Sequence, residues 1–476
     1  MPEFVASTLF SCDRHRLFEY HKAPGAIERL IPPWEDVQVI ASRDSLEVGS
    51  EVLLKQKVFG IPQQWRARHV EFAPEDLFAD TIEQGPFRRW LHRHEFEALS
   101  TNATGSAECR LTDRIAFELP LAPLSNIALP WVRTKLTAMF AYRHRITADD
   151  IAAAQRLSAM RSPSAPPVRI AITGSSGLVG QRVMDLASVL GWQVVRILRP
   201  NSAPSSSRDR ANIQSVVLDP AKANTAECLE GLDAVIHLAG YGIGEKRWTD
   251  SVKQRIASSR IETTQHLTDF LGRLETPPRI LVSASGIGIF GDRGDEPLSE
   301  GSASGNASDF LVQVANGWEA AAKRFEPFGR VAIARLGVVL HPRAGALAKL
   351  LPLARMGLGG PIGSGRQYWP WVHIDDAANI LLHLAVQPNI HGAYHAVSPQ
   401  CPTQKAFAQT LGRVLGRPAF VLAPAFAMRT MLGEMAGPLL LSSTRATTER
   451  LLSSGYVFRF PNLQHALENL LGVQSR

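Results

Sequence analysis

Apolar and polar residues alternate through the first third of the chain, and this pattern predicts antiparallel strands followed by a helix. Such alternation is expected when one face of a strand is buried and the other faces solvent. A run with helical periodicity follows from Leu124 to Arg145, with Pro130 as an interruption. Strands followed by a packing helix predict an α+β domain. The predicted strands span Glu51 to Phe59, Gln64 to Phe72, His92 to Leu99 and Ala107 to Leu119.

A different pattern begins at Val168, where short runs of Val, Ile and Leu alternate with helical stretches. Apolar strands separated by helices are typical of a parallel sheet that is covered on both faces. The first strand leads into a helix from Gly177 to Leu190. The pattern predicts an α/β fold with a Rossmann-type, doubly wound parallel sheet. The predicted strands are 168–173, 192–198, 214–218, 234–239, 279–285 and 330–336.

The segment RSPSAPP at 161–167 marks the clearest domain boundary. Three prolines and two serines follow a helix-like stretch from Asp149 to Met160 and precede the first apolar strand. A chain of 476 residues is also too long for one hydrophobic core. We therefore expect a first domain over residues 1–150, a linker over 151–167 and a larger domain from residue 168 onwards.

Composition and charge narrow the classes of function. Apolar residues make up 45% of the chain and charged residues 20%, as in ordinary folded proteins. The net charge of +7 divides into −1 for residues 1–167 and +8 for residues 168–476. The basic excess is dispersed, without a basic run or a helix-turn-helix pattern, so we expect no nucleic-acid partner. A phosphorylated small ligand accounts better for the charge.

The sequence also bears on localisation. No stretch offers 18 uncharged, predominantly apolar residues, so we expect no membrane-spanning segment and no membrane partner. Glu3 stands where a secretory signal needs a basic flank. We therefore expect a soluble, cytoplasmic protein.

The motif with the most specific chemistry is TGSSGLVG at 173–180. Gly174, Gly177 and Gly180 stand directly after the first predicted strand and at the start of the first helix. The first glycine permits a tight turn, the second lets a pyrophosphate approach backbone N–H groups, and the third lets helix and strand pack closely. The motif therefore predicts dinucleotide binding. The expected cofactor-binding residues also include Ser175, Ser176, Leu178 and Val179 of this loop and Leu238, Ala239 and Gly240 after the fourth strand.

Two residues at strand ends bear on the choice of cofactor. Arg199 follows the second strand, where an NAD-specific site usually presents an acidic residue to the ribose hydroxyls. An arginine there favours a 2′-phosphate, and hence NADP (NADPH) over NAD, with a solvated strand-end arginine as the alternative. Asp219, after the third strand, is a candidate to accept a hydrogen bond from the adenine amine or, equally, an Asp that starts a turn before Pro220.

Residues 168–476 resemble an extended short-chain dehydrogenase/reductase, specifically the atypical, sugar-nucleotide-epimerase-like members. The resemblance rests on TGSSGLVG and on HLAGYGIGEKRW (237–248), SASGIGIFGD (283–292) and GLGGPIGSGRQYWPWVHIDD (357–376). It implies an NAD(P)-binding domain over 168–433 and a small C-terminal substrate domain over 434–476.

Residues 1–150 resemble a START-like (SRPBCC, helix-grip) ligand-binding domain. This resemblance rests on PGAIERLIPPWEDV (24–37) and GPFRRWLHRHEFE (85–97), and it implies a hydrophobic ligand. His92 and His94 of the second segment alternate along a strand and share a face, as metal ligands do. Because the sequence offers no third ligand at a telling distance, we expect no metal site.

The catalytic residues are harder to assign. A standard member of the superfamily uses Tyr-x-x-x-Lys on one helix, and none of the six tyrosines has a lysine four positions later. The helix that should carry the dyad has Phe310, Leu311, Val314 and Ala315 instead. Ser283 and Ser285, at the end of the fifth strand, are the remaining catalytic candidates, since a serine there normally polarises a substrate carbonyl; otherwise they line the nicotinamide pocket.

Three basic residues are candidates to bind a small anionic substrate, because guanidinium and ammonium groups pair with phosphate or carboxylate. They are Lys246, Arg247 and Arg366, for which solvated loop charges are the alternative. Three functions stay open at this stage: an NADP-dependent oxidoreductase or nucleotide-sugar epimerase, a catalytically silent NADPH-binding regulator, and a carrier of a hydrophobic ligand in the first domain.

Overall fold

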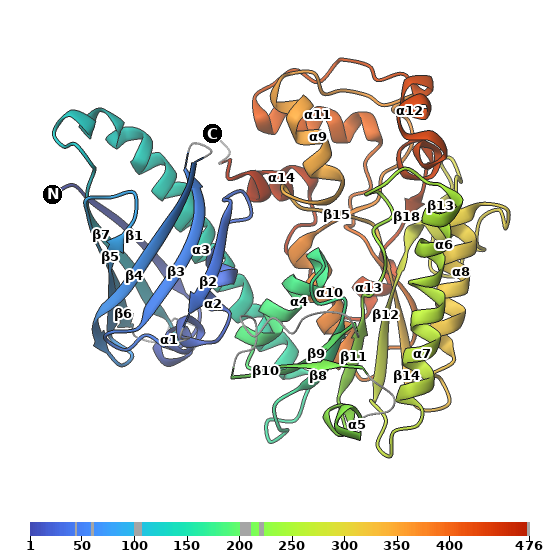
Figure 1. The fold of residues 1–476 in the computed structure, drawn as a ribbon, viewed down its shortest axis with the longest axis horizontal. Helices are drawn as coiled ribbons and strands as arrows, with labels where there is room; N and C mark the ends of the chain where they lie inside the picture. Colours follow the sequence, from blue (N-terminus) through green and yellow to red (C-terminus); the bar gives the residue numbers. More distant parts are fainter. Residues whose placement is uncertain (43–44, 59–60, 100–106, 200–210, 219–222, 474–476) are drawn as a thin grey trace. The chain divides into compact units, whose positions relative to one another are not determined.

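The computed structural model describes residues 1–42, 45–58, 61–99, 107–199, 211–218 and 223–473, which form two compact units (Figure 1). The first unit contains the chain up to Ser158, and the second contains most of the chain from Ala159 onwards. None of the described helices is both long enough and apolar enough to cross a bilayer. The exact domain ranges expected from the sequence stay a prediction.

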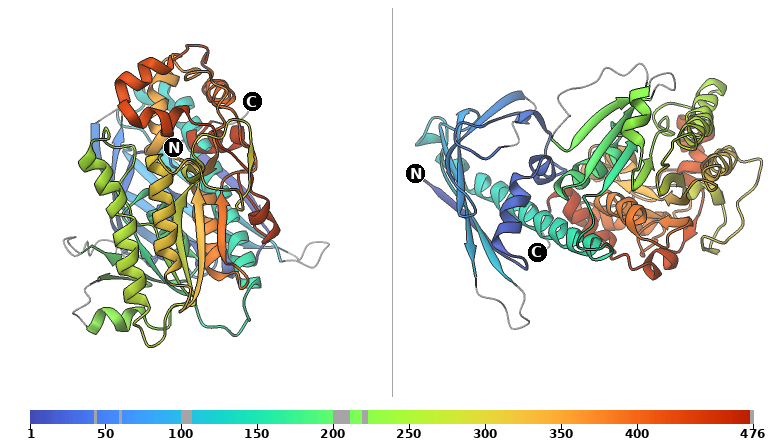
Figure 2. Two further views of the ribbon diagram at one scale, coloured as in Figure 1. Left: turned by 90° about the vertical axis from the view of Figure 1, so that its right-hand side faces the viewer. Right: turned by 90° about the horizontal axis from the view of Figure 1, so that it is seen from below.

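The first unit is a seven-stranded antiparallel sheet with a long helix against one face, as the right-hand view of Figure 2 shows. The strand order is β1-β7-β6-β5-β4-β3-β2. The α+β helix-grip expectation is therefore confirmed, although the alternation pattern missed β1, β2 and β5. The strands are β1 (Glu3–Phe10), β2 (Val37–Ser42), β3 (Glu51–Val58), β4 (Ile61–Ala73), β5 (Leu77–Gln84), β6 (Arg89–Ala98) and β7 (Cys109–Glu118), and two short helices, α1 (Arg14–Lys22) and α2 (Ala26–Leu30), lie between β1 and β2.

The long helix α3 (Leu129–Ala159) follows a short 3₁₀ turn at Leu124–Ala128. The run predicted over 124–145 divides next to Pro130, as expected, since the 3₁₀ turn ends at Ala128 and the α-helix begins at Leu129. Helix α3 holds Pro130 in its first turn, where a proline removes only an N–H that has no partner within the helix. Its Val132, Leu136 and Phe140 pack with buried residues of the sheet in one apolar cluster. The helix continues to Ala159, so the first part of the predicted linker 151–167 is helical.

A buried ion pair ties the short helices of the first unit to α3. Arg29 of α2 and Asp150 of α3 are 0% and 1% exposed, and the guanidinium donates from Nε and Nη2 to the carboxylate over 2.8 Å and 2.6 Å. The hydroxyl of Tyr20, on α1, donates to the same carboxylate at 3.0 Å. Three helices thus meet at one desolvated carboxylate, whose charge the guanidinium compensates.

We predict that Asp150→Ala destabilises the protein by about 3–5 kcal/mol, because the substitution leaves the Arg29 charge buried without its partner. Urea unfolding followed by far-UV circular dichroism measures the effect. Arg145→Ala, on an exposed position of the same helix, is the control and should change the free energy of unfolding by less than about 0.5 kcal/mol. Equal effects of the two substitutions would contradict the prediction.

The second unit is built on a seven-stranded sheet with the order β10-β9-β8-β11-β12-β14-β17, in which all neighbouring strands are parallel. This confirms the doubly wound α/β fold, with β17 as a strand that the sequence pattern missed. Figure 1 shows α7 and α8 on one face of the sheet and α4 and α10 on the other. The strands are β8 (Arg169–Thr173), β9 (Gln193–Leu198), β10 (Ile213–Val217), β11 (Ala234–His237), β12 (Ile280–Gly286), β14 (Arg330–Leu336) and β17 (Gly392–Ala396).

Helices connect these strands and bury the sheet. Helix α10 is buried along almost its whole length, and α7 and α8 contribute to an apolar cluster with β12 and β14. The helices are α4 (Leu178–Val189), α5 (Ala223–Leu229), α6 (Asp250–Ser258), α7 (Ile261–Leu271), α8 (Phe310–Lys323) and α10 (Ile374–Val386), with a 3₁₀ turn at Ile287–Phe290.

The remaining elements of the second unit include a cluster of helices with its own apolar core, and α13, which contacts β17. Helices α9, α11 and α14 surround an apolar cluster that contains Trp371 and Phe460. The elements are α9 (Gly345–Arg355), α11 (Gln404–Leu415), α12 (Ala425–Leu432), α13 (Glu449–Ser453) and α14 (Leu463–Leu471), short helical turns at Gly433–Met435 and Gly437–Leu441, and two small parallel sheets made of β13 (Pro297–Leu298) with β18 (Arg445–Ala446) and of β15 (Val338–Leu340) with β16 (Trp371–His373).

Candidate functional site

The glycine-rich loop between β8 and α4 is packed so closely that two of its positions have no room for a side chain. Gly174 has a φ of +68°, and a Cβ there would lie 2.6 Å from the carbonyl oxygen of Leu238, at the end of β11. A Cβ on Gly180 would lie 2.3 Å from the carbonyl oxygen of Gly174. Real Cβ atoms do not approach backbone this closely, so both positions require glycine. The tight turn and the close helix packing expected from the motif are thus both present.

The same loop presents the N-terminus of α4. The N–H of Gly177 donates to the carbonyl of Gly174 at 2.9 Å, and the helix begins at the next residue, Leu178. Ser176 and Gly177 are exposed, Ser175 is buried, and Leu178 and Val179 are half-buried. The first N–H groups of a helix have no partner within it, so an anion that reaches this exposed turn meets both hydrogen-bond donors and a favourable dipole.

A buried histidine joins the ends of β8 and β11 beside this loop. His237 is fully buried, its Nδ1 lies 2.7 Å from the hydroxyl of Thr173, and its Nε2 lies 2.8 Å from the hydroxyl of Thr264. The Thr173 oxygen also accepts from the backbone N–H groups of Leu238 and Ala239. Burial lowers the pKa of His237 to about 4, so the ring is neutral near pH 7. His237 is a satisfied core residue that fixes the strand ends.

An ion pair that the sequence did not reveal holds helix α4 in place. Arg182 of α4 donates from Nε to Asp375 Oδ1 at 2.6 Å and from Nη2 to Oδ2 at 3.1 Å. Asp375 lies in the first turn of α10, next to His373, whose Nδ1 accepts from the Asp375 N–H at 3.0 Å. The motif WVHIDD therefore positions the helix that follows the glycine loop.

The structure describes only some of the strand-end residues that were expected to contact the cofactor. Arg199 is exposed directly after β9, the strand that pairs with the loop strand β8 in the sheet. Asp219 lies outside the described residues. Gly240 is exposed after β11, and a Cβ there would lie 3.1 Å from the guanidinium carbon of Arg260.

Arg260 is a candidate that sequence reasoning missed. Its guanidinium packs over the ring of Trp318 at 5.1 Å and donates to the carbonyl of Tyr241 at 2.9 Å. Among the described residues no carboxylate lies within ion-pair distance of it, and burial lowers its pKa to about 10. Because nothing in its sequence context sets it apart from other arginines, only the fold shows that it is a half-buried cation beside Gly240.

The two candidate catalytic serines lie on β12 and are both buried. Ser283 is fully buried and its hydroxyl donates to the carbonyl of Ala284 at 3.2 Å. The Ser285 hydroxyl donates at 2.8 Å to Glu319, on α8. Glu319 also accepts from Nε and Nη2 of Arg335, on β14, at 2.8 Å and 3.0 Å. Ser285 is therefore held by a buried carboxylate–guanidinium pair, whose carboxylate lies on the helix that carries the tyrosine and lysine in standard members of the superfamily.

The three basic candidates for substrate binding are all exposed: Lys246, Arg247 and Arg366. Arg247 donates to the carbonyl of Thr430 at 3.3 Å. Gln367, next to Arg366, donates to the carbonyl of Leu440 at 3.0 Å. The loops of Arg247 and Arg366 thus both contact the segment 425–441, which brings two cationic loops to one part of the second unit.

We predict that His237 makes the protein less stable in acid. Its pKa in the folded state is about 4, below the value of about 6.5 in an unfolded chain, so the folded state resists protonation. Its contribution is fully present above pH 6.5 and is lost as the pH falls toward 4, by about 2 kcal/mol between pH 7 and pH 5. Urea unfolding at these two pH values measures the free energy of unfolding. Between pH 7 and pH 5 this free energy should fall by about 2 kcal/mol less in His237→Gln than in the wild type. The exposed His266→Gln should show the pH dependence of the wild type, and an unchanged slope in His237→Gln would contradict the assignment.

Family models match three parts of the chain. The model described as NAD dependent epimerase/dehydratase family matches residues 170–397, and the model described as polyketide cyclase/dehydrase and lipid transport matches residues 12–141. A domain of unknown function matches residues 423–470. The first match contains the glycine loop, both serines and Arg366, and the second contains most of the antiparallel sheet.

Curated relatives cover the second unit. The human epimerase family protein SDR39U1 is 33% identical over 306 residues, which is 64% of this chain and 100% of that protein. The Mycobacterium tuberculosis epimerase family protein MT2273 is 34% identical over 300 residues, which is 63% of this chain and 96% of that protein.

Solved structures agree with this relationship. A nucleoside-diphosphate sugar epimerase from Corynebacterium glutamicum, 27% identical, matches with a TM-score of 0.77 over 98% of this chain and 90% of that chain. Human SDR39U1 (isoform 2), solved with NADPH, is 31% identical and matches with a TM-score of 0.57 over 64% of this chain and 99% of that chain. The resemblance seen in the sequence is confirmed, and the chain belongs to the NAD-dependent epimerase/dehydratase family, with a polyketide-cyclase-like helix-grip domain before its Rossmann-type domain.

Proposed function

We propose that this protein binds NADPH at the glycine loop and catalyses hydride transfer in the oxidation–reduction or epimerisation of an anionic, nucleotide-linked substrate. The observation that carries the proposal is the loop itself, where Gly174 and Gly180 leave no room for a Cβ and the two residues before α4, Ser176 and Gly177, are exposed. These features fit a pyrophosphate at the helix N-terminus. When bound, the nicotinamide would donate a hydride for reduction of the substrate, or in its oxidised form accept one and, in an epimerisation, return it. The human relative solved with NADPH supports the same choice of cofactor.

Different residues of this chain would position the phosphate-binding helix and contact the 2′-phosphate of the cofactor. Asp375 holds Arg182 and so fixes the direction of α4. Arg199 is the candidate for the 2′-phosphate, since an exposed guanidinium at this strand end can donate two parallel hydrogen bonds to it.

The substrate side of the proposal rests on cations. Arg260 has no carboxylate partner among the described residues and lies beside Gly240, and the loops of Arg247 and Arg366 contact the same C-terminal segment. A substrate with phosphate groups would complement these charges. The Corynebacterium neighbour is named as a nucleoside-diphosphate sugar epimerase, which favours a substrate of that class.

We predict that Gly180→Ala weakens NADPH binding at least about tenfold, because the new methyl group displaces the Gly174 carbonyl and with it the phosphate-binding turn. Nicotinamide fluorescence and calorimetric titration measure the affinity. Gly301→Ala is the matched control, since a Cβ there meets nothing closer than 4.0 Å. If both variants bind NADPH like the wild type, the loop is not the cofactor site.

We predict that Arg199→Ala weakens NADPH binding about tenfold or more and leaves NADH binding unchanged. Hydrogen bonds to a charged phosphate contribute about 1.5–3 kcal/mol, and NADH lacks that phosphate. Parallel titrations with both cofactors measure the ratio. The exposed Arg417→Ala, in the same unit, should bind both cofactors normally. An equal loss for NADPH and NADH would remove Arg199 from the 2′-phosphate site.

A second candidate function is NADPH binding without turnover. It is favoured by the Ser285 hydroxyl, which is held by Glu319, and by α8, which lacks the tyrosine and lysine of standard members. A panel of nucleotide sugars and carbonyl compounds, followed by NADPH absorbance and by product analysis, separates the two. Turnover that is lost in Ser285→Ala supports catalysis, and tight binding without turnover across the panel supports the silent regulator.

Two further expectations from the sequence stay predictions. The first is a hydrophobic ligand in the first unit, which the lipid-transport family model at residues 12–141 supports. Organic extraction of the purified full chain, followed by mass spectrometry, tests it. The second is a cytoplasmic location.

A further inference from the structure

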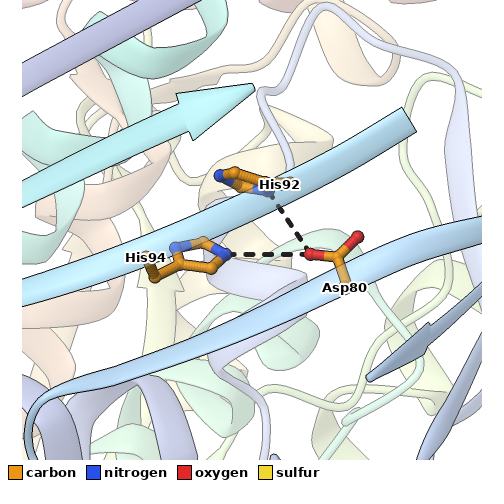
Figure 3. A group of neighbouring side chains, drawn as sticks. All are labelled: Asp80, His92 and His94. Carbon is orange, nitrogen blue, oxygen red and sulfur yellow. Dashed lines mark ion pairs between the residues drawn. The ribbon is translucent and has the colours of Figure 1, made fainter. Parts of the chain in front are cut away.

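Three potential metal ligands converge in the first unit, whereas the glycine loop belongs to the second. Asp80 lies on β5 and is directly opposite His92 on β6 in the register of the sheet, and His94 follows two residues later on the same face. Figure 3 shows both imidazoles directed toward the Asp80 carboxylate. One ligand atom from each residue lies within 4.8 Å of the other two.

The separations suit a tetrahedral ion. Nδ1 of His92 lies 3.4 Å and Nε2 of His94 lies 3.9 Å from Oδ2 of Asp80 (Figure 3). Two ligand atoms that are each about 2.0–2.1 Å from a tetrahedral Zn²⁺ lie about 3.3–3.4 Å apart. Small side-chain adjustments therefore bring all three atoms to bonding distance.

The second nitrogen of each imidazole meets one further carboxylate. Asp113, on β7, is 2% exposed, and its Oδ1 lies 2.9 Å from Nε2 of His92 and 2.6 Å from Nδ1 of His94. Its Oδ2 lies 2.6 Å from Nε2 of His144, on α3. A carboxylate behind a metal-binding histidine fixes the ring and its tautomer, and here one carboxylate serves both rings.

This arrangement leaves a charge to be explained. His92 Nε2 is hydrogen-bonded to Asp113, whereas His94 Nδ1 lies close to the same oxygen without the geometry of a hydrogen bond. If the neutral His92 imidazole donates its one N–H to Asp113, the lone pair of its other nitrogen faces the Asp80 carboxylate, as does Nε2 of His94. Two imidazole lone pairs and a carboxylate oxygen pointing at one another repel unless a cation lies between them. The cation is either a metal ion or additional protons on the rings.

The side chains of the three residues are largely but not completely buried, with exposures of 16% for Asp80, 4% for His92 and 11% for His94. His69 on β4 flanks Asp80 on the other side in the register, and its Nδ1 has no hydrogen-bond partner among the described residues. Three protein ligands leave one position of a tetrahedral ion open for water or for an oxygen of a bound ligand.

We propose that Asp80, His92 and His94 form a binding site for a divalent transition-metal ion of the zinc class in the helix-grip unit, with Asp113 as the carboxylate that orients both histidines. Two imidazoles and one carboxylate with an open position are the ligand set of catalytic rather than structural zinc sites. The ion would polarise a carbonyl or carboxylate oxygen that occupies its open position.

The test uses the full-length protein with any affinity tag removed. After chelation and dialysis, the wild type is titrated with Zn²⁺ in competition with a chromogenic chelator, and with Co²⁺ under visible spectroscopy. We expect one equivalent of Zn²⁺ per chain and intense Co²⁺ absorption typical of four-coordinate sites. Zinc binding below one equivalent at micromolar free Zn²⁺ in the wild type would overturn the proposal.

Variants assign the site. Asp80→Asn and His92→Ala should lose the stoichiometric equivalent, and Asp113→Asn should weaken it about 10–100-fold. The control His15→Ala removes a histidine of the same unit whose side chain is 65% exposed, and should bind like the wild type. Circular dichroism of each metal-free variant shows whether it is folded. A folded Asp80→Asn protein that keeps its equivalent of Zn²⁺ would contradict the proposal.

Discussion

The close approach of three backbone segments at the glycine loop is the constraint on which the second unit depends. Gly174 lies against the end of β11, Gly180 lies against Gly174, and neither contact tolerates a Cβ. These two contacts fix the direction in which α4 leaves the sheet, and other residues hold α4 in that direction. His237 joins the two strand ends through Thr173, and Asp375 holds α4 through Arg182. The long motif at 357–376 thus supports the phosphate-binding turn from a distant part of the chain.

Sequence patterns predicted this part of the fold well because its determinants are local. A strand, a glycine turn and a helix follow one another within TGSSGLVG and its flanks, so spacing alone carries the information. Strand β17, GAYHA, was missed because glycine and histidine break the apolar run, and as an edge strand it pairs only with β14. The Arg182–Asp375 pair was missed because only the fold brings together residues so far apart in the sequence. Likewise, Asp80 became a neighbour of His92 only through the register of β5, a strand that the alternation pattern did not detect.

The proposed chemistry is most constrained at Ser285. On a strand end the hydroxyl of a serine is usually free to polarise a substrate, but here it donates to Glu319, whose other contacts are to Arg335. The carboxylate and the guanidinium compensate each other's burial. Separating them would leave two buried charges without partners, which costs free energy. Ser285 can therefore donate to a substrate carbonyl only if that carbonyl competes with a buried carboxylate, although its oxygen can still accept from a substrate hydroxyl. This requirement separates the chain from standard dehydrogenases, in which a tyrosine and a lysine on this helix would activate the substrate.

Buried charged residues occur in this protein both as simple ion pairs and in a larger cluster. Arg29 with Asp150, and Arg335 with Glu319, are each a cation matched by an anion, and a well-packed apolar pair would fill the same space without loss of stability. The cluster around Asp113 is not a simple pair of this kind, since three imidazoles and a second carboxylate surround one carboxylate between the sheet and α3, with the Arg143 guanidinium interacting electrostatically with both carboxylates. Desolvating so many groups in a domain of this size opposes folding. An interior built only for stability would be apolar, so the cluster is best understood as a binding site whose charge is completed by what it binds.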